Sequence, residues 1–258
     1  MYSVLQNKTN IQLRLKPFPY FIIDDALPWD LYNSLNQNFP EFDKIISSNV
    51  GLNDYKENTA YRLNAAQSLS DQSISEEWKN FIQYHTSHEF TDELFEIFKE
   101  PIKEIYKVGK ENLPNEKNIG VRFRDKSFFN TDCQFVINTP TNGDTTVIEP
   151  HLDNPKEFYA GLLYMKEQGD DSNGGNLTTH EFIGKPSFYG KSRVREENVK
   201  LIEEIEYKQN RLAVFLNSPY SIHGVTKRSK TNHYRKYMNI IGEFNKELFD
   251  YRPFLEKD

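Results

Sequence analysis

The stretch H-L-D-N-P at residues 151–155 places an imidazole and a carboxylate two positions apart. In a β-strand, residues i and i+2 point to the same face, so His151 and Asp153 would direct a nitrogen and an oxygen at one point. Taken alone, the pair fits better a loop in which Asp153 accepts a backbone N–H ahead of Pro155. A metal site therefore depends on a third ligand elsewhere in the chain.

The best third ligand is His223, in N-R-L-A-V-F-L-N-S-P-Y-S-I-H-G-V, where it follows an apolar strand pattern and a short turn. With His151 and Asp153 it would make a set of two imidazoles and one carboxylate. Such a set occupies one face of an octahedron, which is the pattern of non-haem Fe(II) oxygenases. Three coordination positions remain free, two for a chelating co-substrate and one for O₂, whereas a structural site would be closed by four ligands.

An oxygenase of this kind often uses 2-oxoglutarate, whose distal carboxylate needs a cation, and a bidentate guanidinium matches it best. The stretch H-Y-R-K-Y-M-N-I offers Arg235 and Lys236. If it is a strand, Arg235 shares a polar face with a tyrosine and an asparagine, whereas Lys236 shares an apolar face with Met238 and Ile240. The alternation predicts that Arg235 faces the pocket. The other interpretations are that Arg235 is a surface charge or that Lys236 binds the co-substrate.

Five motifs together resemble one known family: H-L-D-N-P, L-L-Y-M-K, G-G-N-L, I-H-G-V and Y-R-K-Y-M-N-I. They are similar to the prolyl-4-hydroxylase-like branch of the Fe(II)/2-oxoglutarate-dependent dioxygenase superfamily, over residues 133–245 and more loosely over 17–40. The resemblance implies a double-stranded β-helix fold. It implies His151, Asp153 and His223 as iron ligands, Arg235 as the partner of 2-oxoglutarate, and Tyr164 as a hydrogen-bond donor to the same carboxylate.

The resemblance also implies the reaction: hydroxylation of an unactivated C–H bond, coupled to decarboxylation of 2-oxoglutarate to succinate. Fe(II), 2-oxoglutarate and O₂ would take part, with ascorbate in support. A prolyl or peptidyl substrate and a small molecule both remain open, and the basic loop around 182–200 either attracts an acidic substrate or is simply solvated. Two other functions stay open, a catalytically silent jelly-roll binding module and a metal-dependent cupin-type enzyme that does not use 2-oxoglutarate.

Residues 20–23 read as a strand, a helix is expected to start near Pro28, and residues 75–107 are helical with a break or kink at Pro101. The later half alternates short apolar runs with turns; the expected strands are C-Q-F-V-I-N, A-G-L-L-Y-M, N-L-T-T-H-E-F, K-L-I-E-E-I-E-Y, R-L-A-V-F-L and K-Y-M-N-I-I-G-E-F.

We therefore expect an α+β or mainly β fold. With the resemblance, this becomes a double-stranded β-helix (a cupin-like jelly roll) with N-terminal helices packed on the major sheet. A single domain over 1–258 is expected, with support in 1–118, the jelly-roll core in 119–247 and a C-terminal tail in 248–258.

Composition indicates which partners and which cellular compartment to expect. The 258 residues carry a formal net charge of −6 with acids and bases interleaved, which argues against a nucleic-acid partner. The single cysteine, Cys133, suits a reducing compartment. No leader and no membrane-length apolar run is evident, so a soluble cytoplasmic protein is expected, of open oligomeric state. His85 and His88 are expected on an exposed helix face, and His180 at a solvent-facing strand position.

Overall fold

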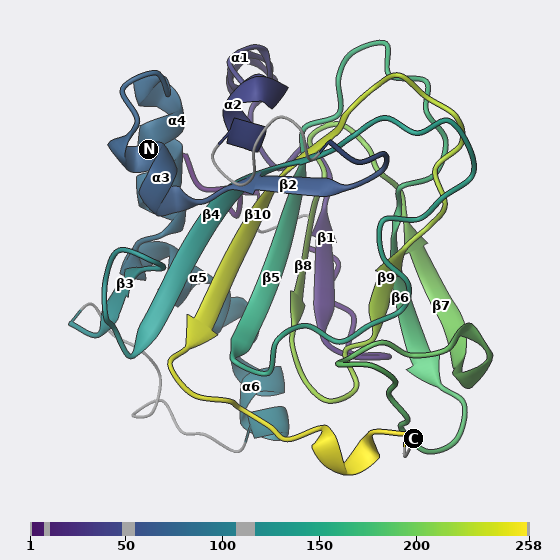
Figure 1. Ribbon diagram of the computed structural model, residues 1–258. Coiled ribbons are helices and arrows are strands. Elements are labelled where there is room, and N and C mark those ends of the chain that lie inside the picture. Colours follow the sequence, from purple (N-terminus) through teal and green to yellow (C-terminus); the bar gives the residue numbers. More distant parts are fainter. Residues whose placement is uncertain (1, 8–10, 48–54, 107–116, 257–258) are drawn as a thin grey trace.

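Two sheets face each other, and helices cover the outer side of the larger one (Figure 1). All described strand pairs are antiparallel except β3 with β4. The computed structural model describes residues 2–7, 11–47, 55–106 and 117–256. Strands of the larger sheet are joined in the order β1-β8-β5-β10-β4-β2, and β3 pairs in parallel with β4. The bounds are β1 (Tyr20–Ile23), β2 (Ala60–Leu63), β3 (Ile119–Val121), β4 (Phe129–Asn138), β5 (Glu157–Tyr164), β8 (Leu212–Leu216) and β10 (Arg235–Phe244).

The smaller sheet contains β6 (Leu177–Phe182), β7 (Val199–Ile205) and β9 (His223–Val225), in the order β7-β6-β9. An isolated bridge between His151 and His223 extends it by one more segment. Along the chain, β5 lies in the larger sheet, β6 and β7 in the smaller, β8 in the larger, β9 in the smaller and β10 in the larger. This repeated exchange between sheets brings the segments around 151, 223 and 235 to one enclosed space.

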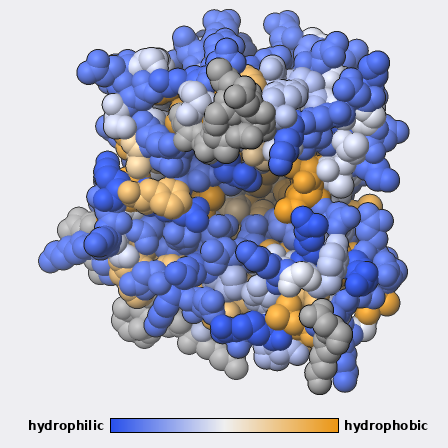
Figure 2. Space-filling model, in the orientation of Figure 1, coloured by the Kyte–Doolittle hydropathy of each residue, from blue (hydrophilic) through white to orange (hydrophobic). Residues whose placement is uncertain are grey.

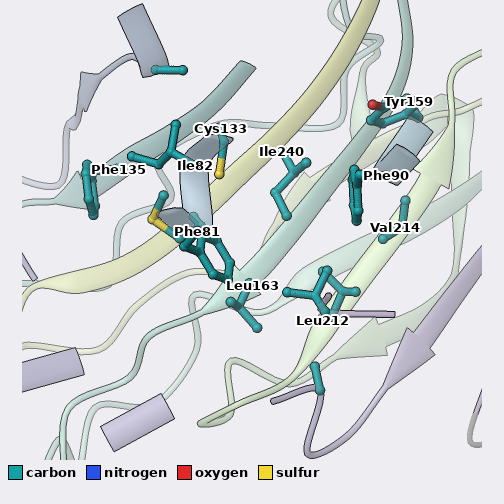
Figure 3. Close-up of a cluster of buried hydrophobic side chains, with 14 of the residues drawn as sticks. Phe81, Ile82, Phe90, Cys133, Phe135, Tyr159, Leu163, Leu212, Val214 and Ile240 are labelled. Atoms are coloured by element: carbon teal, nitrogen blue, oxygen red, sulfur yellow. The ribbon is translucent and has the colours of Figure 1, made fainter. Parts of the chain in front are cut away.

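The two faces of the larger sheet pack in different apolar clusters, because successive side chains of a strand point to opposite sides. Phe135 and Ile137 on β4 and Met238 and Ile240 on β10 belong to a large apolar cluster with the helices (Figure 3). Val136, between the first two, belongs instead to a second cluster that lies between the sheets. The structure therefore shows the expected alternation along residues 235–240: Arg235 faces the cavity between the sheets, whereas Met238 and Ile240 face the helices.

Within the described residues, six α-helices precede β3: α1 (Trp29–Gln37), α2 (Phe42–Ser47), α3 (Ala65–Ser70), α4 (Glu76–His85), α5 (His88–Ile97) and α6 (Lys99–Tyr106). Pro28 lies at the start of α1, as expected. Ser75 and Ser87 cap α4 and α5 by accepting backbone N–H groups with their side chains. The helical run ends at Ile97 and resumes with Pro101 in the first turn of α6, where a missing N–H is tolerated.

Helices packed on the larger sheet agree with the expected mixed architecture. Trp78 of α4 is fully buried and contacts Phe135 of β4 edge-on, with ring centroids 4.7 Å apart. All six strands expected in the later half are present, and so is the strand expected at residues 20–23 (β1), whereas β2, β3 and β9 were not foreseen. In the part of the chain that the structure describes, each helix falls short of the length and apolar character needed to cross a bilayer.

Candidate active site

A cavity of about 710 Å³ opens between the two sheets and contains most of the residues that the sequence singled out. Figure 2 shows it as a hollow near the middle of the visible face, with hydrophobic residues inside and mostly hydrophilic residues around it. His151, Asp153, His223 and Arg235 all line it. The volume is in the range of small-molecule sites in proteins.

His151, Asp153 and His223 converge although they come from two distant segments. The Nε2 atom of His151 lies 3.6 Å from Asp153 Oδ1, and that of His223 lies 3.4 Å from Asp153 Oδ2. All three potential ligand atoms lie within 4.8 Å of one another. The backbones of the two histidines exchange two hydrogen bonds, of 2.8 and 3.1 Å, which places both imidazoles on the same side of the ladder.

Both imidazoles are held in one tautomer by the backbone. His151 Nδ1 is 2.9 Å from the carbonyl of Glu149, and His223 Nδ1 is 3.0 Å from that of Ser221. Because a carbonyl only accepts, each Nδ1 carries the proton and donates it, so each Nε2 presents a lone pair toward Asp153. A donated Nδ1–H of this kind is typical of histidines that bind metals.

The three residues change one another's pKa values. Burial acts to raise the pKa of Asp153, but the imidazoles of His223 and His151 outweigh it and hold that pKa well below its usual range. Burial, assisted by His223, lowers the pKa of His151, whereas for His223 the carboxylate of Asp153 overcomes burial and raises the pKa. The carboxylate is therefore ionised at neutral pH.

The stretch 151–155 is held from outside by later parts of the chain. Of these five residues, His151 alone joins a ladder, so Asp153 lies in a loop rather than a strand. Leu152, between the ligands, is buried in a third apolar cluster that includes Phe188, Val194 and Ile222, with Phe249, Tyr251, Phe254 and Leu255 packed on it. The Leu152 N–H also donates to the carbonyl of Ser192.

The basic loop around 182–200 therefore supports the ligand segment. The described residues that line the cavity include none from 183–198. Arg195, one of its basic residues, is paired with Glu256 at 3.0 Å. The interpretation of this loop as a determinant of substrate charge is not supported by its position.

Arg235 is almost fully buried at one end of the cavity and retains an unused donor. Its Nε donates to the carbonyl of Gly175 at 2.6 Å, and Nη1 donates to Asn138 at 3.4 Å. Its Nη2 has no hydrogen-bond partner among the described residues. Gly175, of the G-G-N-L motif, has φ +73°, and a Cβ there would come 3.0 Å from Arg235 Cδ, so glycine is needed for the close approach.

Tyr164 is buried beside Arg235, behind the cavity wall rather than in it. The guanidinium carbon lies 5.2 Å from the centre of its ring. The Tyr164 hydroxyl has no hydrogen-bond partner among the described residues. Burial raises its pKa, opposed by the positive charge of Arg235. The expected pair of Arg235 and Tyr164 is therefore together, and both keep a free polar atom.

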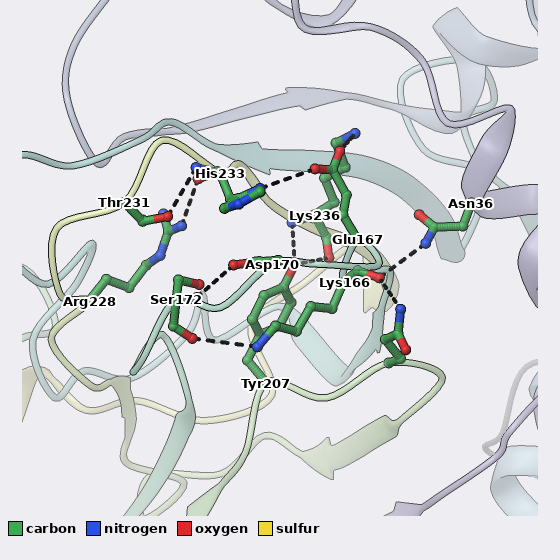
Figure 4. Close-up of polar contacts among 11 residues, drawn as sticks. Asn36, Lys166, Glu167, Asp170, Ser172, Tyr207, Arg228, Thr231, His233 and Lys236 are labelled. Carbon is green, nitrogen blue, oxygen red and sulfur yellow. Dashed lines mark hydrogen bonds and ion pairs between the residues drawn. The ribbon is translucent and has the colours of Figure 1, made fainter.

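Lys236, the alternative to Arg235, points to the opposite face of β10. Its Nζ is paired with Glu167 and lies 5.5 Å from the ring centre of Phe39, on the helix side (Figure 4). The same glutamate has His233 at 3.6 Å. Lys236 therefore belongs to a polar cluster outside the cavity.

Two expectations about other histidines are wrong. His85 is fully buried: its Nδ1–H donates to Phe81 at 2.7 Å, and its Nε2 accepts the N–H of Val4 at 3.2 Å. Burial lowers its pKa to about 3. His180 is 9% exposed, not solvent-facing, and lines a smaller neighbouring cavity. Both histidines have satisfied partners, since His180 bonds with Thr178 at 2.8 Å.

Sequence reasoning missed Glu157 and Arg122, which line the same cavity. Burial, followed by the charge of Asp153, raises the pKa of Glu157 to about 8. Arg122 Nη2 lies 3.9 Å from Glu157 Oε1. The one sequence signal for Glu157 is its position four residues after Asp153, at the start of a strand.

This chain is similar to known proteins in its three-dimensional structure. No family model matches the sequence, and no curated protein matches it. A dioxygenase for auxin oxidation from Arabidopsis thaliana, solved in complex with 2-oxoglutarate, has a TM-score of 0.50 at 10% identity, covering 92% of this chain and 88% of that one.

Two further solved structures are prolyl hydroxylases. The one from Pseudomonas putida has a TM-score of 0.42 at 14% identity and covers 87% of this chain and 91% of that one. The one from Trichoplax adhaerens, in complex with a peptide fragment, has a TM-score of 0.45 at 13% identity, covering 93% and 87%. The likeness to the Arabidopsis enzyme, at 10% identity, shows that the two proteins share a fold.

Proposed function

We propose that this protein is an Fe(II)- and 2-oxoglutarate-dependent oxygenase that hydroxylates an unactivated C–H bond. One observation carries the proposal: His151, Asp153 and His223 converge in the same cavity in which a buried Arg235 keeps an unused guanidinium N–H. A metal ligand set with free positions and a buried cation nearby fit a chelating dicarboxylate better than any other ligand class.

The fold that goes with this function is a double-stranded β-helix within one domain over 1–258. Support comes from the exchange of successive strands between two facing sheets. β1, from the N-terminal part, pairs with β8 of the later half, and this argues against an independent N-terminal unit.

The three proposed ligands fit a ferrous ion. Donor atoms at 90° around a metal, with bonds of about 2.1 Å, lie about 3 Å apart. The separations of 3.4 and 3.6 Å between the imidazole nitrogens and the carboxylate oxygens are close to this value. The lone pairs of the two Nε2 atoms and the ionised Asp153 are the donor set that octahedral Fe(II) accepts.

Arg235 and Tyr164 fit the distal carboxylate of 2-oxoglutarate. A buried donor without a partner costs about 1–3 kcal/mol, and here two donors, Arg235 Nη2 and the Tyr164 hydroxyl, lack partners among the described residues. A carboxylate in the cavity would accept from Arg235 Nη2, and the Tyr164 hydroxyl, which lies beside the guanidinium but outside the cavity lining, is the second donor that the proposal assigns to it. Three aromatic rings, of Tyr164, Tyr207 and Tyr237, surround the guanidinium at 4.7–5.2 Å and fix its direction.

In the proposed mechanism, Fe(II) and 2-oxoglutarate supply the oxidation that turns O₂, the keto acid and a C–H bond into succinate, CO₂ and an alcohol. The role of the protein is to position the reactants. His151, Asp153 and His223 would hold the metal, and Arg235 would bind the far carboxylate of the keto acid. Leu162, Leu177, Phe215 and Val225 line the cavity with apolar surface, which excludes water around the reacting bond.

The proposal is tested by anaerobic titration of Fe(II) and 2-oxoglutarate, following the weak visible charge-transfer band of the chelate. Asp153→Ala should weaken iron binding by more than about a hundredfold, since it removes a ligand. Arg235→Met should raise the Kd of 2-oxoglutarate by about thirtyfold or more with iron binding retained. Lys236→Met, on the neighbouring residue of the opposite face, is the matched control and should leave both affinities unchanged.

Each alternative function gives a different result. A silent binding module gives no charge-transfer band in the wild type. A metal enzyme that does not use 2-oxoglutarate binds iron through Asp153 but is indifferent to Arg235→Met. Either result rejects the proposal. A cytoplasmic location, expected from the single cysteine, stays a prediction.

A further inference from the structure

A second cavity, of about 380 Å³, lies outside the candidate active site and shares none of its lining residues. It is bounded by one face of α1, by the segment that follows β5 and by the turn between β7 and β8. The described residues that line it are one tryptophan, five amides and one glutamate. Its volume is at the lower end of the range of roughly 300–1,000 Å³ that is usual for small-molecule sites.

The sequence of α1 places four of these residues on one side of the helix. Trp29, Asn33, Asn36 and Gln37 are spaced i, i+4, i+7 and i+8, which is one face of an α-helix. The indole of Trp29 is 45% exposed, so much of its surface is open to a ligand. The helix therefore presents an aromatic ring followed by three amides to the cavity.

The backbone carbonyl of Lys166 fixes the direction of two amides. It accepts from Asn36 Nδ2 and from Gln209 Nε2, each at 3.1 Å (Figure 4 shows the bond from Asn36). Because a carbonyl only accepts, each amide nitrogen points to Lys166 and each amide oxygen points away from it. Asn36 Oδ1 is buried and has no hydrogen-bond partner among the described residues. A buried acceptor of this kind costs about 1–3 kcal/mol unless a ligand or water donates to it.

The other lining residues leave the cavity without a free charge. Within the described residues, the side chains of Asn33, Gln37 and Gln168 make no hydrogen bond, so each offers donors and an acceptor. Glu167 is already paired with Lys236, which balances its charge. The described lining includes no lysine, arginine or histidine. An anion would find no cation here, and a cation would find no unpaired carboxylate.

We propose that this cavity binds a neutral sugar, either free or at the end of a glycan. A sugar ring has an apolar C–H face, which can pack on the exposed indole of Trp29, and hydroxyl groups that both donate and accept. One hydroxyl would donate to Asn36 Oδ1. The amides come from three separate segments and so surround the ligand, as the hydroxyls of a sugar require. A flat nucleobase would need its partners in one plane. The inference does not depend on the proposed function.

The experiment measures binding to the full chain. Glucose, galactose, mannose, xylose, fucose and N-acetylglucosamine are screened by saturation-transfer NMR, with adenosine and choline as a flat and a cationic competitor. Each sugar that binds is titrated by tryptophan fluorescence. The chain has two tryptophans, and Trp78 is fully buried, so a shift in emission reports on Trp29. Comparison of the free sugar with its methyl glycoside and a short oligosaccharide tells a free sugar from the end of a glycan.

The variants test the indole and the buried acceptor separately. Trp29→Ala should weaken the sugar at least about tenfold, whereas Trp29→Phe, which keeps an aromatic ring, should stay within about threefold of the wild type. Asn36→Ala should weaken it about three- to tenfold. Tyr220→Ala removes a ring that is 55% exposed, and Gln72→Ala removes an exposed amide; neither residue lines this cavity, so both controls should leave affinity unchanged. NMR titration measures the variants of Trp29, and thermal unfolding shows that each variant is folded.

The inference is overturned if no sugar of the panel binds the wild type, if Trp29→Ala binds as tightly as the wild type, or if adenosine or choline binds more tightly than every sugar. Asp153→Ala and saturating 2-oxoglutarate should leave sugar affinity unchanged, because the two cavities share no residue; a loss in either case would place the sugar in the other cavity and also overturn the inference. If a sugar binds as expected while Fe(II) and 2-oxoglutarate do not, the proposed function fails and this inference stands.

Discussion

The backbone conformation of Phe123 lowers the stability of the folded protein. Its backbone is in the left-handed region, and its ring, 71% exposed, gains little burial in return. A bulky side chain in this region costs about 1–3 kcal/mol. The ring does contact the guanidinium of Arg122. We infer that this contact, at the rim of the cavity, is the reason for the strain.

Phe123→Asn should therefore stabilise the protein. Asparagine tolerates the left-handed region better than phenylalanine, so the free energy of unfolding should rise by about 1 kcal/mol. The contact between the ring and the Arg122 guanidinium is lost at the same time. Urea unfolding measures the change in stability. A variant that is less stable than the wild type would contradict this account.

Local spacing predicts some site residues and not others. His151 and Asp153 are two positions apart, and the alternation of polar and apolar residues around Arg235 predicts which side of the strand it occupies. A short window of sequence is therefore enough to predict that these residues face a common site. Glu157 and Arg122 are different, because they approach each other only through the register of two strands and the bulge at Gly242. No pattern within either segment predicts that meeting.

At the scale of elements, α4 shows how tertiary packing overrides an expectation from composition. His85 was expected on an exposed face, but it packs against Phe81 and Phe90, with ring centres 3.9 and 4.7 Å away. Its Nε2 accepts the N–H of Val4, from a segment that lies about eighty positions earlier. The helical periodicity of 75–107 did not reveal this partner, because it lies outside the helix.

His85 should make stability depend on pH below neutrality. Its pKa is about 3 in the folded protein against 6.5 for an unperturbed histidine, so the unfolded chain binds one more proton between these values. Stability should therefore fall as pH decreases from about 6.5 toward 3, by up to about 1.4 kcal/mol per pH unit. Urea unfolding at several pH values should give a slope that is smaller by about one proton in His85→Gln. Equal slopes would contradict the assignment.

At the scale of the whole molecule, one face of the larger sheet contributes to stability and the other forms the candidate site. Its outer face contributes most of the apolar core, and its inner face lines the cavity. The six longer strands were predictable because alternating apolar residues mark them. The pairing order and the short strand β9 were not, since both depend on contacts between distant segments.

The segment 248–256 does not line the cavity but supports the residues that do. Phe249, Tyr251, Phe254 and Leu255 pack on the cluster that buries Leu152, between the two proposed ligands. A chain that ends at residue 247 should retain its far-ultraviolet circular dichroism but bind Fe(II) about tenfold more weakly or worse. Leu152→Ala should act in the same direction and destabilise the protein by about 2–4 kcal/mol. Unchanged iron affinity in both variants would show that the segment has no such role.

The order of these contacts along the chain bears on how the protein matures during synthesis. His151 and Asp153 leave the ribosome well before His223, Arg235 and the segment that packs on Leu152. A nascent chain thus has two of the proposed ligands but neither the third nor the packing that holds them. If His151, Asp153 and His223 bind iron as proposed, the supported site can assemble only after the segment 248–256 has been synthesised, because that segment packs on the cluster around Leu152.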